Sequence, residues 1–176
     1  MRPSGFLSLR FAGTLAVLAL TAALSAQDTN SAGIQYLGHV GVGVSDVARA
    51  LHFYEDQLGL TEVFKFKKKD GTITQVYLRV NDNNFVELFP GATEQGQFPR
   101  SVTGIRHLGF FVKDLQQTLH TLAERGYPLP ADAFEQAKKV RADGTLLYFL
   151  KDPDGNNIEL SQILPDSDQA KSRKGR

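Results

Sequence analysis

His39-Val-Gly-Val-Gly-Val-Ser-Asp46 matches His107-Leu-Gly-Phe-Phe-Val-Lys-Asp114 without a gap, from the first residue to the last. The two stretches share a His, a Gly, a Val and an Asp at equivalent positions. Further along the chain, Asn84-Phe-Val-Glu87-Leu88 resembles Asn156-Asn-Ile-Glu159-Leu160, at a slightly larger spacing. A chance match in pattern would seldom keep the identity of a His and a Glu, so the sequence predicts two copies of one module.

Each module follows the same order of elements. Alternating side chains after each His predict a strand, and apolar residues at helical spacing then follow Asp46 and Asp114, which stand where helix N-caps belong. Extended segments are expected at residues 62–67, 72–80 and 84–88 in the first half, and around residues 134–141, 145–150 and 156–160 in the second. Each half therefore reads βαβββ, which places the protein in the α+β class, with modules at about 34–91 and 104–163.

The segment over residues 1–26 differs in character from the rest of the chain. Arg2 and Arg10 accompany a continuous apolar or small stretch over residues 11–24, and a polar segment follows Ala26. This layout is typical of a secretory signal peptide that is cleaved after Ala26. The apolar stretch is shorter than the ~20 residues that span a bilayer. We therefore expect a periplasmic or secreted protein without a stable membrane anchor.

Composition excludes several classes of protein. The chain of 176 residues contains no Cys, which rules out disulfide scaffolds, iron–sulfur clusters and thiol catalysis. Its net charge of +1 gives no electrostatic basis for binding nucleic acid. Residues 27–164 have the length of a single domain. Residues 165–176 mix polar and charged side chains without an apolar period, which predicts a disordered tail.

One His and one Glu in each module are predicted to face the same concave side. Because side chains alternate across a strand, His39, Glu87, His107 and Glu159 all point away from the aliphatic face of their strands. Two imidazoles and two carboxylates suit one divalent ion such as Zn, Ni, Co, Mn or Fe(II). Each residue alone has a plainer interpretation, as a hydrogen-bonded strand His or a solvent-facing Glu. The repetition favours the metal site.

A substrate pocket is expected beside these residues. Phe85 and Phe89 share the face of Glu87, Phe111 shares the face of His107, and Asn157 shares the face of Glu159. Three phenylalanines predict a partly apolar small-molecule ligand.

The sequence from about Ile34 to Ile163 resembles the vicinal oxygen chelate superfamily, which includes glyoxalase I, bleomycin-resistance proteins and extradiol dioxygenases. The most specific matches are residues 39–46, residues 53–60 (Phe-Tyr-Glu-Asp-Gln-Leu-Gly-Leu) and residues 152–160 (Asp-Pro-Asp-Gly-Asn-Asn-Ile-Glu-Leu). The resemblance implies that the two modules form a glyoxalase-like cup-shaped mixed sheet around one metal ion. It places the ligand order His, Glu, His, Glu of bacterial glyoxalase I on the four residues named above.

The same resemblance implies a metal-dependent lyase or isomerase that acts on a small vicinal-oxygen substrate. Glu159 would be the base that moves a proton, with Glu87 as its symmetric partner. Gly43, Gly91 and Thr103 stand where glyoxalase I has the Arg and Asn side chains that hold glutathione. A glutathione adduct is therefore not expected as the substrate.

Two alternatives of other kinds stay open. A ring-cleaving extradiol dioxygenase would use His39, His107 and Glu159 with Fe(II), and Glu87 would crowd that site. A non-catalytic sequestering protein of the bleomycin-resistance type needs no metal-ligating residues. The presence of all four such residues therefore favours an enzyme over a sequestering protein. The sequence also leaves open whether the cup closes within one chain or between the two copies of a homodimer.

Overall fold

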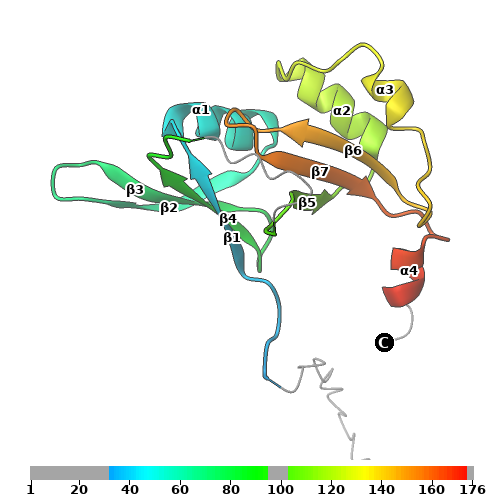
Figure 1. Ribbon diagram of the computed structural model, residues 1–176, viewed down its shortest axis with the longest axis horizontal. Helices are drawn as coiled ribbons and strands as arrows, with labels where there is room; N and C mark the ends of the chain where they lie inside the picture. The colour runs from blue at the N-terminus through cyan, green and yellow to red at the C-terminus, as the bar shows by residue number, and fades with distance from the viewer. Residues whose placement is uncertain (1–31, 95–102, 174–176) are drawn as a thin grey trace, which may run out of the picture. The chain divides into compact units, whose positions relative to one another are not determined.

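The computed structural model describes residues 32–94 and 103–173 (Figure 1). The predicted signal peptide lies outside the described residues, as does most of the linker between the two modules. The chain divides into two compact units, Met1–Gln35 and Tyr36–Arg176, and every element below belongs to the second unit. Within the described ranges, no helix is long and apolar enough to cross a membrane.

Module one is a four-stranded mixed sheet with its helical segment packed beside it (Figure 1). In chain order its elements are β1 (His39–Val44), α1 (Val47–Leu51), the π-helical turn η1 (His52–Gln57), β2 (Thr61–Lys67), β3 (Ile73–Arg79) and β4 (Phe85–Pro90). The strand order is β1-β4-β3-β2, and β1 is parallel to β4. The βαβββ order that the sequence predicts for this half is confirmed.

Module two contains a three-stranded sheet of order β5-β7-β6, in which β5 is parallel to β7. Its elements are β5 (Leu108–Phe111), α2 (Leu115–Glu124), α3 (Ala133–Gln136), β6 (Leu146–Lys151) and β7 (Asn157–Gln162). The strand expected around residues 134–141 was wrong. Only Val140 pairs in this region, through an isolated bridge to Leu146.

The short helix α3 replaces that strand for a physical reason. Ala133 and Ala137 are both fully buried, and their spacing along the chain places them on one helical face. Gln136 also donates a hydrogen bond to the Asp132 carboxylate at 2.6 Å, across one helical turn. Burial at helical spacing therefore outweighs the weak strand pattern of this segment.

Both modules bury the aliphatic face of their sheets, as the alternation of side chains predicts. Val42 and Val44 in β1 are buried, and so are Val86 and Leu88 in β4. Ile158 and Leu160 occupy the corresponding positions of β7 and join the same core. The N-caps are confirmed as well: the Asp46 carboxylate accepts two backbone amides at 2.7 and 3.0 Å, and Asp114 accepts one at 2.9 Å.

The turn before β7, residues 152–156, ties module two to module one, and we call it the latch turn. Asp154 accepts hydrogen bonds from the Ser45 amide at 3.1 Å and from the Ser45 hydroxyl at 2.5 Å. The buried Asp152 accepts from the Tyr54 hydroxyl at 3.0 Å. Burial and the neighbouring Asp152 carboxylate raise the pKa of Tyr54. The latch turn thus holds the start of α1 and the middle of η1.

The C-terminal segment differs from the disordered tail that its composition predicts. It forms a helix, α4 (Asp168–Arg173), and the guanidinium of Arg173 lies 4.8 Å from the ring centre of Phe111. Ser167 is buried against Gly144, where a β-carbon would lie 2.9 Å from the Ser167 Cα. Gly144 has a φ of +79°, a left-handed conformation that glycine adopts readily. Because glycine has no β-carbon, Ser167 can also approach it closely.

Candidate functional site

The first predicted pair, His39 and Glu87, meets on the face of the module-one sheet that points away from the aliphatic core. We call this face of either sheet its open face. His39 begins β1 and Glu87 lies in the neighbouring strand β4, with Gly41 directly opposite Glu87 in the parallel register. The His39 Nε2 and Glu87 Oε2 atoms are 3.5 Å apart. Glycine at position 41 leaves room for the Phe89 ring, and we call the pair of His39 and Glu87 half-site one.

Tyr77, which sequence analysis did not single out, completes half-site one. It lies opposite Glu87 in the register of β3 and β4, and a hydrogen bond to the Glu87 carboxylate raises the pKa of Tyr77. The ring of His39 meets the Tyr77 ring edge-on at 5.9 Å, and Phe64 stacks on Tyr77 at 4.4 Å. The phenol therefore orients the carboxylate while its ring orients the imidazole.

Half-site two repeats this arrangement in module two. The His107 Nε2 and Glu159 Oε2 atoms are 3.4 Å apart, and Gly109 lies opposite Glu159 in the register of β5 and β7. The ring of His107 meets Phe149 at 5.6 Å with the planes inclined at 75°. Here the Glu159 carboxylate receives its hydrogen bond from the Ser161 hydroxyl, at 2.5 Å.

In each half-site a hydroxyl group forms a hydrogen bond with the glutamate, but the two hydroxyl groups come from different positions in the repeat. In the alignment that pairs Glu87 with Glu159, Tyr77 corresponds to Phe149 and Phe89 corresponds to Ser161. One hydroxyl comes from the neighbouring strand and the other from the same strand as the Glu. The repeat does contain a sign of this difference, because Tyr77 aligns with Phe149. Recognising the sign requires knowing which residues of β3 and β6 lie opposite the two glutamates.

The spacing inside each half-site fits two ligands of one ion. In a tetrahedral site, ligand bonds of about 2.0–2.2 Å to Zn²⁺ place two neighbouring ligand atoms roughly 3.3–3.6 Å apart. The separations of 3.5 and 3.4 Å lie within this range. They are longer than the ~2.7–2.9 Å of a direct charge-assisted hydrogen bond. Imidazole nitrogen with carboxylate oxygen is also a donor set that divalent transition metals accept.

The structure does not bring the four residues together within one chain. Among residues 32–94 and 103–173, no group of three or more metal-ligating side chains converges. The edge strands β1 and β5 belong to separate sheets, and we call the gap between them the seam. His39 lines one end of the seam together with Phe111, and His107 lines the other end together with Gly43. The strands thus run in opposite directions, which separates the two histidines.

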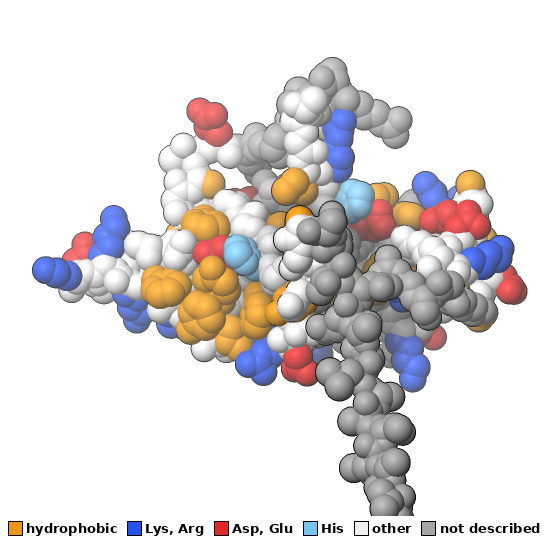
Figure 2. All heavy atoms as spheres, turned by 90° about the horizontal axis from the view of Figure 1, so that it is seen from below, with side chains coloured by type: hydrophobic (Ala, Val, Ile, Leu, Met, Phe, Trp, Pro, Cys, Tyr) orange, Lys and Arg blue, Asp and Glu red, His pale blue; other side chains and the backbone are white. Residues whose placement is uncertain are grey.

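The other predicted pocket residues take separate places. Phe89 and Phe111 are exposed on the open faces, and a β-carbon on Gly41 would lie 2.9 Å from the Phe89 ring. Phe85 lines a cavity at the seam, and Phe111 lines the same cavity. Asn157 is engaged by the protein itself: its amide nitrogen donates to the Arg106 carbonyl at 3.2 Å, and its oxygen accepts from Lys151 at 3.0 Å. Figure 2 shows hydrophobic side chains gathered beside histidine and acidic side chains on one face.

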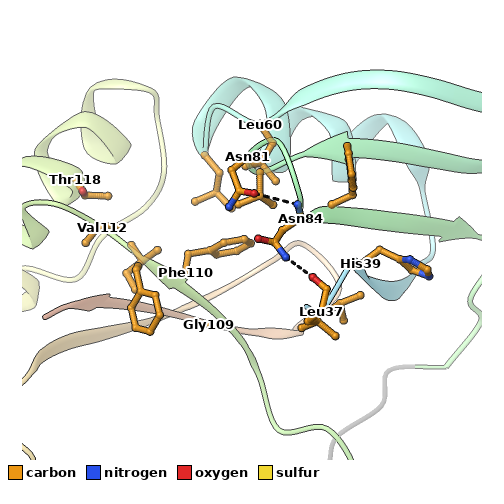
Figure 3. Close-up of a pocket in the computed structure, with 16 residues that line it drawn as sticks. Leu37, His39, Leu60, Asn81, Asn84, Gly109, Phe110, Val112 and Thr118 are labelled. Atoms are coloured by element: carbon orange, nitrogen blue, oxygen red, sulfur yellow. Dashed lines mark hydrogen bonds between the residues drawn. The ribbon is translucent and has the colours of Figure 1, made fainter. Parts of the chain in front are cut away.

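The cavity at the His39 end of the seam, which we call the seam cavity, has a volume of about 470 Å³ (Figure 3). Its walls come from both modules. The lining residues are Leu37, Gly38, His39, Val40, Leu58, Leu60, Val80, Asn81, Asn84, Phe85, Gly109, Phe110, Phe111, Val112, Thr118 and Leu160. Three of the residues predicted from the sequence, His39, Phe85 and Phe111, are among them. The other walls could not be predicted, because they depend on how the two modules meet.

These features define a two-module α+β protein with one His–Glu pair in each module. Residues 36–160 match the family model of the Glyoxalase/Bleomycin resistance protein/Dioxygenase superfamily, and the chain belongs to this superfamily. The family resemblance and the fold class that the sequence predicts are thereby confirmed.

Known proteins similar to this chain include a probable lyase and an antibiotic binding protein. A probable lactoylglutathione lyase of Synechocystis sp. is 25% identical over 131 residues, which cover 72% of this chain and 95% of the relative. A glyoxalase family protein from Enterococcus faecalis is 25% identical, with a TM-score of 0.55 over 73% of this chain and 98% of its own. The antibiotic binding protein TnmS3 from Streptomyces sp. shares the fold, at 22% identity and a TM-score of 0.53 over 74% of this chain and 98% of its own.

Proposed function

We propose that this protein is a divalent-metal-dependent lyase or isomerase acting on a small vicinal-oxygen substrate, with a metal site that forms between two copies of the chain. The observation that carries the proposal is the pair of equivalent half-sites, each with an imidazole and a carboxylate at ligand spacing. Half-site one of one copy would meet half-site two of its partner. Two-fold symmetry would then produce two complete sites from one type of contact.

Exposed aromatic side chains support a second copy as the partner. Phe64, Phe66, Phe89, Phe111 and Phe149 are all exposed. Large apolar patches on a soluble protein usually mark a surface that another molecule covers. Contact between open faces would bury these rings and enclose the half-sites together.

The two carboxylates are suited to different roles. A divalent ion, when bound, would hold two adjacent oxygens of the substrate and polarise its carbonyl group. Glu87 is confined, with 6% of its side chain exposed, and the Tyr77 phenol holds it in place. Glu159 is more accessible, with 20% of its side chain exposed. We therefore assign Glu159 as the base that takes the proton beside the carbonyl and returns it to the neighbouring carbon.

The substrate is proposed to be something other than a glutathione adduct. Gly43, Gly91 and Thr103 provide no charged or amide side chain for the carboxylates of glutathione. The proposed export of the protein, after removal of residues 1–26, would also separate it from the cytoplasmic thiol pool. Another small molecule with vicinal oxygens, partly apolar, fits the exposed phenylalanines better.

A second candidate function is sequestration of an aromatic compound. Phe64 and Phe66 are exposed beside Tyr77, and the three rings contact one another at centroid distances of 4.4 to 6.4 Å. Such an aromatic surface can stack on a planar ligand without any metal ion.

Metal analysis of the purified protein, combined with sedimentation, distinguishes the two functions. The proposal expects one divalent ion per chain, a dimer in solution, and turnover of methylglyoxal–thiol adducts or related substrates that chelating agents abolish. A metal-free protein that binds a planar aromatic drug without turnover would support sequestration and contradict the enzyme.

A further inference from the structure

We propose that the seam cavity, which adjoins half-site one at His39, is a second ligand site that takes an uncharged and mainly apolar small molecule. This inference goes beyond the proposed enzyme and holds for the single chain. At about 470 Å³, the cavity is within the size range of small-molecule sites in proteins.

The cavity lies where the internal repeat loses its symmetry. At the other end of the seam, the latch turn bridges the two modules, since Asp154 contacts Ser45 and Asn156 donates to the Gly43 carbonyl at 3.4 Å. A separate cavity of about 340 Å³, lined in part by His107 and Asn156, lies at that end. The loop over residues 80–84 is the counterpart of the latch turn in the repeat that aligns Glu87 with Glu159. The hydrogen bonds of this loop are internal instead: the Asn81 side-chain oxygen accepts the amides of Asn83 and Asn84 at 2.9 and 3.0 Å.

The walls of the cavity determine the class of ligand. Aliphatic and aromatic side chains from both modules make up most of the lining, and none of the lining residues is Asp, Glu, Lys or Arg. A charged ligand would lose its hydration there without a compensating partner. An apolar ligand would be stabilised there, because binding removes its apolar surface from water. The lining therefore selects an uncharged molecule.

Polar groups at the rim of the seam cavity would orient a bound ligand. Figure 3 shows Asn81 and Asn84 together on one side of the cavity, with Val112 and Thr118 on the opposite side. The Asn84 amide nitrogen donates to the Leu37 carbonyl, which fixes the orientation of this side chain. Amide side chains carry both donors and acceptors. A ligand with one carbonyl or hydroxyl group on an apolar body matches this arrangement.

The test is a titration with the uncharged dye Nile red, compared with the anionic dye anilinonaphthalene sulfonate. We expect saturable binding of one Nile red per chain and at least tenfold weaker binding of the anionic dye. Thr118→Leu on one wall and Val80→Phe on the other fill the cavity, and each should weaken Nile red binding at least tenfold. Thr121→Leu is the matched control, because Thr118 and Thr121 both donate to the carbonyl one turn earlier in α2, and Thr121 lies outside the lining.

His107→Ala separates this site from the proposed metal site. It removes a half-site residue that does not line the seam cavity, so Nile red binding should stay unchanged while metal binding falls. The inference is overturned if Nile red does not bind, or if it binds equally well to both filled variants. It is also overturned if the filled variants change the oligomeric state and leave the affinity for Nile red unchanged. The cavity would then be a contact between two copies of the chain.

Discussion

The Ser161 hydroxyl donates a hydrogen bond of 2.5 Å to the carboxylate of Glu159, which precedes it on the same strand and the same face. In the other module, Tyr77 on a neighbouring strand holds the equivalent Glu87. The Ser161 contact links Glu159 only to its own strand, and 20% of the Glu159 side chain is exposed. The Tyr77 contact links Glu87 to a neighbouring strand, and only 6% of the Glu87 side chain is exposed. This difference underlies the separate roles proposed for the two glutamates.

Replacing Tyr77 with phenylalanine should weaken metal binding without unfolding the protein. Phenylalanine already occupies the equivalent position at Phe149, so the ring itself is tolerated there. Loss of a partner that orients a metal ligand typically costs about 10–100-fold in affinity. Calorimetric titration with Zn²⁺ or Co²⁺ measures this change. Phe66→Leu, a neighbouring ring with no hydroxyl, is the control, and equal affinities for Tyr77→Phe and the wild type would refute the role of the phenol.

Glu159→Gln should reduce turnover more than Glu87→Gln when both variants are saturated with metal. A general base contributes about 10²–10⁴-fold to the rate. Because Glu87 is proposed only to bind, its replacement should act mainly through metal affinity. Steady-state rates over a range of metal concentrations separate these effects. If saturating metal restores Glu159→Gln but not Glu87→Gln, the two roles are reversed.

Asp152→Ala should destabilise the fold through the latch turn. Its buried carboxylate accepts from the Tyr54 hydroxyl at 3.0 Å, from the Asn156 side chain at 2.7 Å and from two backbone amides. Loss of hydrogen bonds to a buried charged group costs about 2–4 kcal/mol in the free energy of unfolding. Urea denaturation followed by circular dichroism measures the change. Asp82→Ala is the control: this residue lies in the counterpart loop of module one, is exposed, and should change stability by less than about 0.5 kcal/mol.

Tyr54 should make the protein sensitive to alkaline pH. Burial raises its pKa in the folded state, so the folded protein keeps the phenol protonated while the unfolded chain ionises near pH 10. Stability from this group is complete below about pH 10 and falls as the pH rises above it. Unfolding free energies between pH 8 and 11.5 test this prediction. Tyr54→Phe should start from a lower stability at pH 8 but decline less steeply, and parallel pH profiles would contradict the assignment.

The internal repeat explains why much of the fold could be predicted from sequence. His39 and His107 are each followed by an Asp at the same spacing, which determines the strand, the N-cap and the helix in both modules. The alternation of residues also predicts that Glu87 and Glu159 point away from the aliphatic core, and both meet the histidine of their own module. Each His–Glu pair therefore follows from local pattern and sheet register alone.

The remaining features depend on contacts between distant segments. α3 forms because Ala133 and Ala137 are buried against other elements, which a local strand pattern does not reveal. The separation of the two half-sites follows from the opposite directions of β1 and β5 across the seam. α4 is held by contacts to Gly144 and Phe111 that sequence spacing does not indicate.

Mixing two inactive variants tests directly whether the metal site forms between copies. His39→Ala disables half-site one and His107→Ala disables half-site two, so each homodimer lacks a complete site. After unfolding and refolding together, about half of the dimers are mixed, and one of the two sites in each mixed dimer is intact. The account predicts recovery of about a quarter of the wild-type metal content and activity. No recovery, with mixed dimers demonstrated by mass spectrometry, would contradict it.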